Sequence, residues 1–155
     1  MTIRILDIVF ETMVDGPGLR TSIYFAGCKH HCKGCHNPQS WDMKGGYEMP
    51  IEHILTLIKE DEFAHVTFSG GDCFFQIEGA LELAKRIKTE TDKTIWVYTG
   101  YTFEHIASDE SLSRLLKYID VLVDGPYVED LRNTDLPFRG SENQRIIYIN
   151  NEKSN

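Results

Sequence analysis

Along this chain, segments with the apolar spacing of a helix alternate with segments whose residues are typical of a strand. Three segments, 50–58, 77–87 and 112–119, carry apolar side chains at the i, i+3, i+4, i+7 spacing of an amphipathic helix, and Pro50 is a favoured first helical position. Between these segments lie short stretches rich in β-branched and aromatic residues, which predict strands. The strands expected on this basis cover residues 3–10, 21–26, 65–69, 94–98, 121–123 and 145–149.

Strands that alternate with amphipathic helices predict an α/β fold with a parallel sheet, open or partly rolled, and helices on its outside. The 155 residues suffice for a single domain, 1–155, whose last residues, 150–155, are expected to form a disordered polar tail. In such sheets, ligands bind at the carboxyl ends of the strands. The site is therefore expected among four loops that follow predicted strands, at 28–35, 70–72, 99–101 and 124–126.

Charge and composition exclude two classes of function. A net charge of −8 argues against a nucleic-acid-binding surface, which would need a basic face. The chain has no run of eighteen apolar residues, so no membrane span is expected, and residues 1–10 do not look like a signal peptide. We therefore expect a cytoplasmic protein whose partner is another protein or a small molecule.

Three cysteines, Cys28, Cys32 and Cys35, are spaced C-x3-C-x2-C in one loop. Thiolates are preferred ligands of iron–sulfur clusters and of zinc, and close spacing in a chain without a signal peptide favours a metal over disulfides. The loop supplies three ligands where a closed site has four, so an iron–sulfur cluster held here would leave one iron open to a substrate. A zinc site is an alternative, with its fourth ligand among the neighbouring histidines, His30, His31 and His36.

Further candidates follow or precede other predicted strands. In Gly70-Gly71-Asp72, two glycines would let a ligand approach the backbone closely, and the carboxylate of Asp72 could accept from an ammonium group, although such glycines often form only a tight turn. Arg20 could neutralise a carboxylate near the cysteines or lie in solvent. Asp124 is a functional candidate at the end of another strand.

Together these motifs resemble those of the radical SAM superfamily. Over nearly its whole length the chain is similar to the activating proteins of anaerobic ribonucleoside-triphosphate reductases, which are small glycyl-radical enzyme activases. Pyruvate formate-lyase activating enzymes share several of the motifs but are considerably longer, and the segment 139–145 favours the reductase activases. The resemblance rests on residues 15–20, 28–38, 70–72, 96–101 and 139–145.

The resemblance implies a partial, incomplete β/α barrel of the radical SAM type and an oxidoreductase activity. Cys28, Cys32 and Cys35 would hold a 4Fe-4S cluster whose open iron binds the amino and carboxylate groups of S-adenosylmethionine. A low-potential electron, from flavodoxin or a similar donor, would cleave S-adenosylmethionine to methionine and a 5′-deoxyadenosyl radical. That radical would abstract a glycine Cα hydrogen from the glycyl-radical subunit of the anaerobic ribonucleoside-triphosphate reductase, the expected partner.

The resemblance also nominates residues that would contact S-adenosylmethionine. Gly70, Gly71 and Asp72 would face the methionine ammonium, whereas Gly34 and His36, which flank the last cysteine, would lie against the adenine. No catalytic side chain is implied beyond the cluster and the cofactor. The docking surface for the reductase is expected to include the lysines in and after the cysteine loop, Lys29, Lys33 and Lys44.

Cys73 departs from the family pattern, which has a proline directly after Gly-Gly-Asp. We expect a small, partly buried side chain that replaces proline at this position. As a fourth cluster ligand, Cys73 would instead close the cluster and make the chain an electron carrier that cannot bind S-adenosylmethionine. The alternatives to the activase are therefore this electron carrier, a zinc-stabilised binding module that uses His36, and an activase of a different glycyl-radical enzyme.

Overall fold

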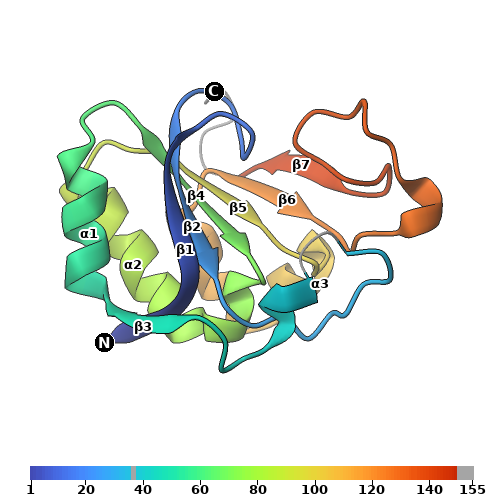
Figure 1. Cartoon of the computed structure of the whole chain (residues 1–155), viewed down its shortest axis with the longest axis horizontal. Coiled ribbons are helices and arrows are strands. Elements are labelled where there is room, and N and C mark those ends of the chain that lie inside the picture. The colour runs from blue at the N-terminus through green and yellow to red at the C-terminus, as the bar shows by residue number, and fades with distance from the viewer. Residues whose placement is uncertain (36–37, 150–155) are drawn as a thin grey trace.

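The computed structural model describes residues 1–35 and 38–149 of the chain. Seven strands within these residues form one open sheet in the order β3-β1-β2-β4-β5-β6-β7 (Figure 1). The four central strands are parallel: β2 (Arg20–Phe25), β4 (His65–Gly70), β5 (Ile95–Tyr98) and β6 (Val121–Asp124). The outer strands are antiparallel to their neighbours: β1 (Thr2–Thr12), β3 (Tyr47–Pro50) and β7 (Arg145–Tyr148).

Three α-helices accompany this sheet, α1 (Ile51–Glu60), α2 (Ile77–Glu90) and α3 (Phe103–Ser108). Short 3-10 helices lie between them: η1 (Pro38–Trp41), η2 (Cys73–Gln76), η3 (Leu112–Tyr118) and η4 (Glu129–Leu131). No helix in the described part of the chain is long and apolar enough to cross a membrane.

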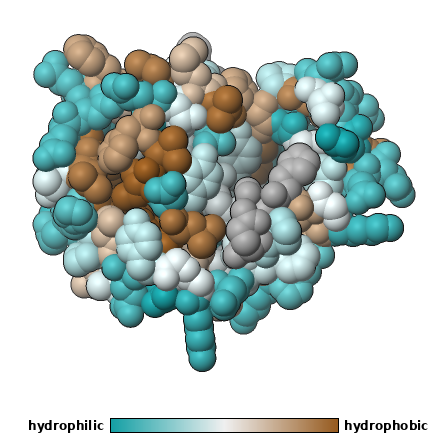
Figure 2. Space-filling view, in the orientation of Figure 1, coloured by the Kyte–Doolittle hydropathy of each residue, from teal (hydrophilic) through white to brown (hydrophobic). Residues whose placement is uncertain are grey.

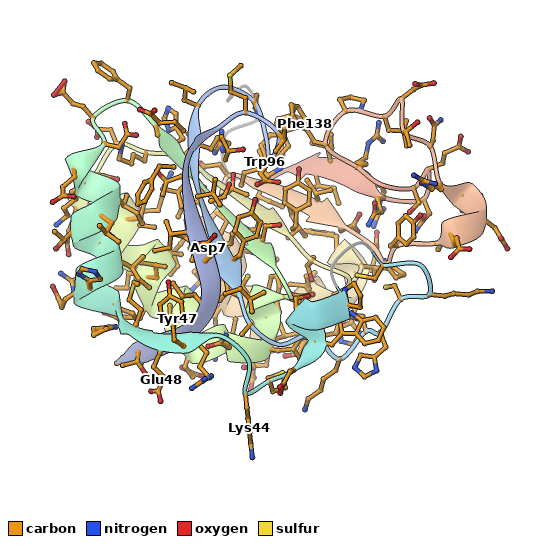
Figure 3. All side chains as sticks on the ribbon, in the orientation of Figure 1. Asp7, Lys44, Tyr47, Glu48, Trp96 and Phe138 are labelled. Carbon is orange, nitrogen blue, oxygen red and sulfur yellow. The ribbon has the colours of Figure 1, made fainter. Side chains whose placement is uncertain are left out.

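The two faces of the sheet are covered differently. Alternate residues of β1, β2, β4 and β5, such as Ile23 and Phe68, pack with α1 and α2 in the main hydrophobic core. On the opposite face Trp96 packs against Phe138, from the segment between β6 and β7, with ring centroids 5.6 Å apart (Figure 3). Among the described residues no α-helix covers this second face, and the segment between β6 and β7 extends away from α1 and α2 (Figure 1).

Apolar side chains also remain visible at the surface around α1 and β1, whereas the rim of the molecule is mostly hydrophilic (Figure 2). The second half of β1 contributes to this, because β3 pairs only with Thr2 to Ile5 and leaves Phe10 48% exposed.

The predicted α/β class and the central parallel strands are confirmed, with three corrections. The sheet is mixed, because β1, β3 and β7 pair with their neighbours in antiparallel orientation. Pro50 does not open the helix, because its extended backbone pairs with Thr2 and α1 begins at Ile51. The segment expected as a third long helix is the 3-10 helix η3, and the short elements β3 and α3 were not predicted. The expected disordered tail at 150–155 lies outside the described residues.

Arg20 occupies neither of the places expected for it, because it is only 3% exposed at the amino end of β2, away from the cysteine loop. Its guanidinium donates to Thr67 Oγ1 at 2.8 Å, to Pro17 O at 2.9 Å and to Val66 O at 3.0 Å. Burial lowers the pKa of Arg20 to about 10, so the group stays protonated at neutral pH. Arg20 thus fastens the turn at 15–18 to β4.

We expect Arg20→Ala to lower the free energy of unfolding by about 3 kcal/mol, because the substitution leaves three buried acceptors without their donor. Urea denaturation of the metal-free protein measures the change. Arg114→Ala is the matched control, since it removes a guanidinium whose ion pair with Glu78 is exposed, and it should change stability little. Equal effects of the two substitutions would contradict the structural role of Arg20.

Candidate metal centre

The cysteine loop begins directly after β2 and folds back onto η1. Gly27 N donates to Ser40 O at 2.7 Å, and Cys28 N donates to Trp41 O at 3.2 Å. No disulfide joins the four cysteines, all of which lie in the described residues. Cys28, Cys32 and Cys35 are partly exposed and line one pocket of about 220 Å³.

This pocket collects the ends of the parallel strands, as expected from the sequence. Besides the cysteines it is lined by Ser69, Gly70 and Gly71 at the end of β4, by residues 98–100 at the end of β5 and by Gly125 after β6. The segment between β6 and β7 closes one side with Tyr127, Gly140 and Gln144. Because carboxyl ends of parallel strands share one sheet edge, four loops distant in sequence meet at this pocket.

The three cysteine thiols that line this pocket fit an iron–sulfur cluster. Within residues 1–35 and 38–149, no three His, Cys, Asp or Glu side chains converge to hold one metal ion. The cysteines of a 4Fe-4S cluster bind different iron atoms, so such a cluster does not require three ligands to converge on one ion. His36, the main zinc candidate, lies outside the described residues, as does its expected contact with adenine.

Burial raises the pKa of the Cys28 thiol to about 11 and also raises the pKa of Cys32. Desolvation is the largest cause for both thiols, because burial disfavours the charged thiolate. In the metal-free chain these two thiols therefore keep their protons at neutral pH. A metal cluster that binds to these two sulfur atoms has to displace their protons.

Gly70 and Gly71 approach protein backbone as well as the pocket. A Cβ at Gly71 would lie 2.4 Å from Gly27 O, and a Cβ at Gly70 would lie 2.6 Å from Phe25 N. Gly71 N donates to Phe25 O at 2.8 Å, so the loop after β4 lies directly against the start of the cysteine loop. The two glycines are thus required by the contact between these loops, a reason that the sequence did not reveal.

Asp72 follows these glycines but is only 1% exposed and does not line the pocket. Its Oδ2 accepts from Thr99 Oγ1 at 2.7 Å, from Gly100 N at 2.9 Å and from His30 Nε2 at 2.9 Å. Its Oδ1 accepts from Phe74 N at 3.0 Å. The carboxylate therefore joins the loops that follow β2, β4 and β5.

Three other sequence candidates lie away from the pocket lining. Gly34 has a φ of +79° and faces Glu129, whose carboxylate a Cβ at Gly34 would meet. Asp124 is buried and accepts from Arg145 and from Phe103 N, so its role is to fix the end of β6. Cys73 is only 1% exposed in the main hydrophobic core, so it is more deeply buried than the partly buried side chain expected there.

The structure adds site residues that sequence reasoning missed. Gln144 Oε1 accepts from Gly140 N at 2.8 Å, and Gln144 Nε2 donates to Gly125 O at 3.0 Å. This side chain therefore ties the segment between β6 and β7 to the loop after β6. Ser69 and Tyr98 could have been identified from the sequence, because each directly precedes a strand-end loop that was predicted to form part of the site.

We expect Gly71→Ala to lower both the stability of the chain and its iron content after anaerobic reconstitution. The added Cβ collides with the Gly27 carbonyl and should cost about 2 kcal/mol of unfolding free energy. Gly45→Ala serves as the control, because its Cβ would meet nothing closer than 3.1 Å and it lies outside the pocket lining. Iron content equal to that of the control would show that the close loop contact does not matter for the site.

Known proteins share these features over most of the chain. A family model for a 4Fe-4S single cluster domain matches residues 14–147. The activating protein of anaerobic ribonucleoside-triphosphate reductase from Vibrio cholerae is 39% identical over 142 residues, which cover 86% of this chain and 90% of the relative. The activating proteins of phage T4 and Escherichia coli are 34% and 32% identical, over 86% and 88% of this chain and 86% and 93% of their own lengths. This chain therefore contains a 4Fe-4S cluster domain and belongs to the family of anaerobic ribonucleoside-triphosphate reductase-activating proteins.

Proposed function

We propose that this chain activates an anaerobic ribonucleoside-triphosphate reductase by generating its glycyl radical with S-adenosylmethionine. The observation that carries the proposal is that Cys28, Cys32 and Cys35 line one pocket together with Gly70 and Gly71, while the fourth cysteine lies in the core. Three ligands leave one iron of a 4Fe-4S cluster open. The names of the relatives support the reductase as the partner.

The cluster and S-adenosylmethionine would together supply the chemistry of the reaction. One electron from the cluster would break the bond between sulfur and the 5′ carbon of S-adenosylmethionine, which releases methionine and a radical that takes the glycine Cα hydrogen of the reductase. The chain itself would bind the cluster and S-adenosylmethionine, orient them, and keep water and oxygen away from them. We propose flavodoxin or a similar low-potential protein as the electron donor and the cytoplasm as the place of action.

Individual residues would contribute as follows. The three cysteines would hold the cluster, and the backbone of Gly70 and Gly71 would contact the methionine ammonium. Asp72, whose carboxylate already accepts four hydrogen bonds, would act by holding this loop in place. Gly34 and His36 remain our proposed adenine neighbours.

We also propose that the open sheet corresponds to the incomplete β/α barrel of radical SAM proteins. Its four central parallel strands and a pocket at their carboxyl ends support this assignment. The sheet face opposite α1 and α2 would then receive the substrate, because no α-helix among the described residues covers it.

The first test is electron paramagnetic resonance of the reduced, anaerobically reconstituted protein with and without S-adenosylmethionine. We expect the signal to change on addition of S-adenosylmethionine in the wild type and in Cys73→Ala, since Cys73 lies outside the pocket. Cys28→Ala should bind much less iron. A signal that ignores S-adenosylmethionine, together with cluster loss in Cys73→Ala, would replace the activase with an electron carrier.

A second test concerns the docking surface. Lys29, Lys33 and Lys44 are exposed, and Lys44 extends into solvent (Figure 3). We expect Lys29→Glu with Lys33→Glu to reduce the rate of reductase activation about tenfold, because charge complementarity accelerates association. Cleavage of S-adenosylmethionine without the reductase should stay unchanged.

Lys85→Glu with Lys117→Glu, at exposed positions on α2 and η3, is the matched double charge reversal for this test. If it slows activation as much as the changes in the cysteine loop, the effect comes from total charge and the docking surface lies elsewhere.

A further inference from the structure

We infer that His30 is a positioning residue that locks the middle of the cysteine loop onto the buried carboxylate of Asp72, and thereby sets the cluster ligands relative to the loops after β4 and β5. This inference rests on the function proposed above. It concerns a side chain that is neither a cysteine ligand nor part of the Gly-Gly-Asp motif.

His30 lies midway between Cys28 and Cys32, so its position constrains two of the three proposed ligands. Its Nε2 lies 2.9 Å from Asp72 Oδ2, and the two side chains are only 15% and 1% exposed. Because an ionised carboxylate can only accept, the imidazole donates in this bond. A hydrogen bond to a charged group in such a shielded place is stronger than one at the surface.

Asp72 transmits this constraint to the rest of the pocket. The same Oδ2 that accepts from His30 also accepts from Thr99 Oγ1 and Gly100 N, both of which belong to the loop after β5. Asp72 N in turn donates to Gly27 O at 2.9 Å, which holds the start of the cysteine loop. His30 therefore adds a second attachment, at the centre of the loop.

The packing around the imidazole ring fits this role independently of the hydrogen bond. The ring lies against Tyr101 in an edge-on arrangement at 4.6 Å and against Phe75 at 5.1 Å between centroids. A Cβ at Gly100 would lie 2.5 Å from His30 Cδ2, although Gly100 has no left-handed φ. The absence of a side chain at Gly100 is thus explained by the ring and not by the backbone.

His31, the next residue, provides a natural contrast. It is exposed, and its ring stacks on Trp41 at 4.5 Å with an interplanar angle of 19°. Side chains that orient metal ligands commonly change the affinity and the properties of a site without binding the metal. Of these two adjacent histidines, His30 is the one whose bond reaches the loops that line the pocket.

The test compares four full-length proteins: wild type, His30→Phe, His30→Gln and His31→Phe. His30→Phe keeps a ring but loses the donor, whereas His30→Gln offers an amide donor at a reach similar to Nε2. His31→Phe changes a ring in the same loop that makes no bond to Asp72.

The first readout is the S-adenosylmethionine concentration that gives half of the change in the electron paramagnetic resonance signal of the reduced cluster. We expect a roughly tenfold increase for His30→Phe, which corresponds to the loss of one charge-assisted hydrogen bond. His30→Gln should recover most of the wild-type value, and His31→Phe should equal it. If both His30 variants match His31→Phe, the inference is wrong.

The second readout needs neither cofactor nor activity. Lys29 and Lys33 are exposed on either side of His30, so trypsin cleavage after them reports how firmly the loop is held in the metal-free chain. We expect faster cleavage in His30→Phe than in His30→Gln or His31→Phe. Equal rates in all four proteins would overturn the inference.

The two readouts separate failure of this inference from failure of the proposed function. If no protein, including the wild type, responds to S-adenosylmethionine, the proposed function fails while the cleavage rates still decide the role of His30. If His30→Phe does not retain a cluster, recovery of iron content in His30→Gln supports the inference. A His30→Gln protein that loses the cluster equally contradicts it.

Discussion

The site depends on the parallel pairing of β2 with β4. Their register places Phe25 beside Gly70, so the chain that leaves β2 as the cysteine loop runs against the chain that leaves β4. The two backbones come so close that neither Gly70 nor Gly71 can carry a Cβ without collision. Parallel neighbours cannot be joined by a tight turn, and the long connection between β2 and β4 is where the cysteines, η1 and α1 are found.

Buried polar groups hold this sheet together at both ends. Arg20 fastens the turn at 15–18 at the amino end of β2, and Asp72 gathers three loops at the carboxyl end. Each group is satisfied by several hydrogen bonds, which offset the cost of removing a charge from water. The walls of the pocket are therefore held in place by buried interactions that lie behind them.

Sequence periodicity predicted the central elements because burial imposes it directly. The helices at 51–60 and 77–90 and the parallel strands bury regular apolar positions, so their patterns are strong. The edge strand β3 was missed because it is short and largely exposed, with no apolar alternation to reveal it. Pro50 shows the limit of a local preference, since pairing with β1 overrides its tendency to open a helix.

The sequence by itself determined that three candidate thiolate ligands lie together, since the spacing of Cys28, Cys32 and Cys35 within eight residues confines them to one loop whatever the fold. It also determined that strand-end loops would surround them, because parallel sheets collect ligands at one edge. Only the tertiary structure decided what Asp72, His30 and Gln144 do. Their partners lie on other loops, and contacts between residues distant in sequence follow from strand order and register, which no local pattern encodes.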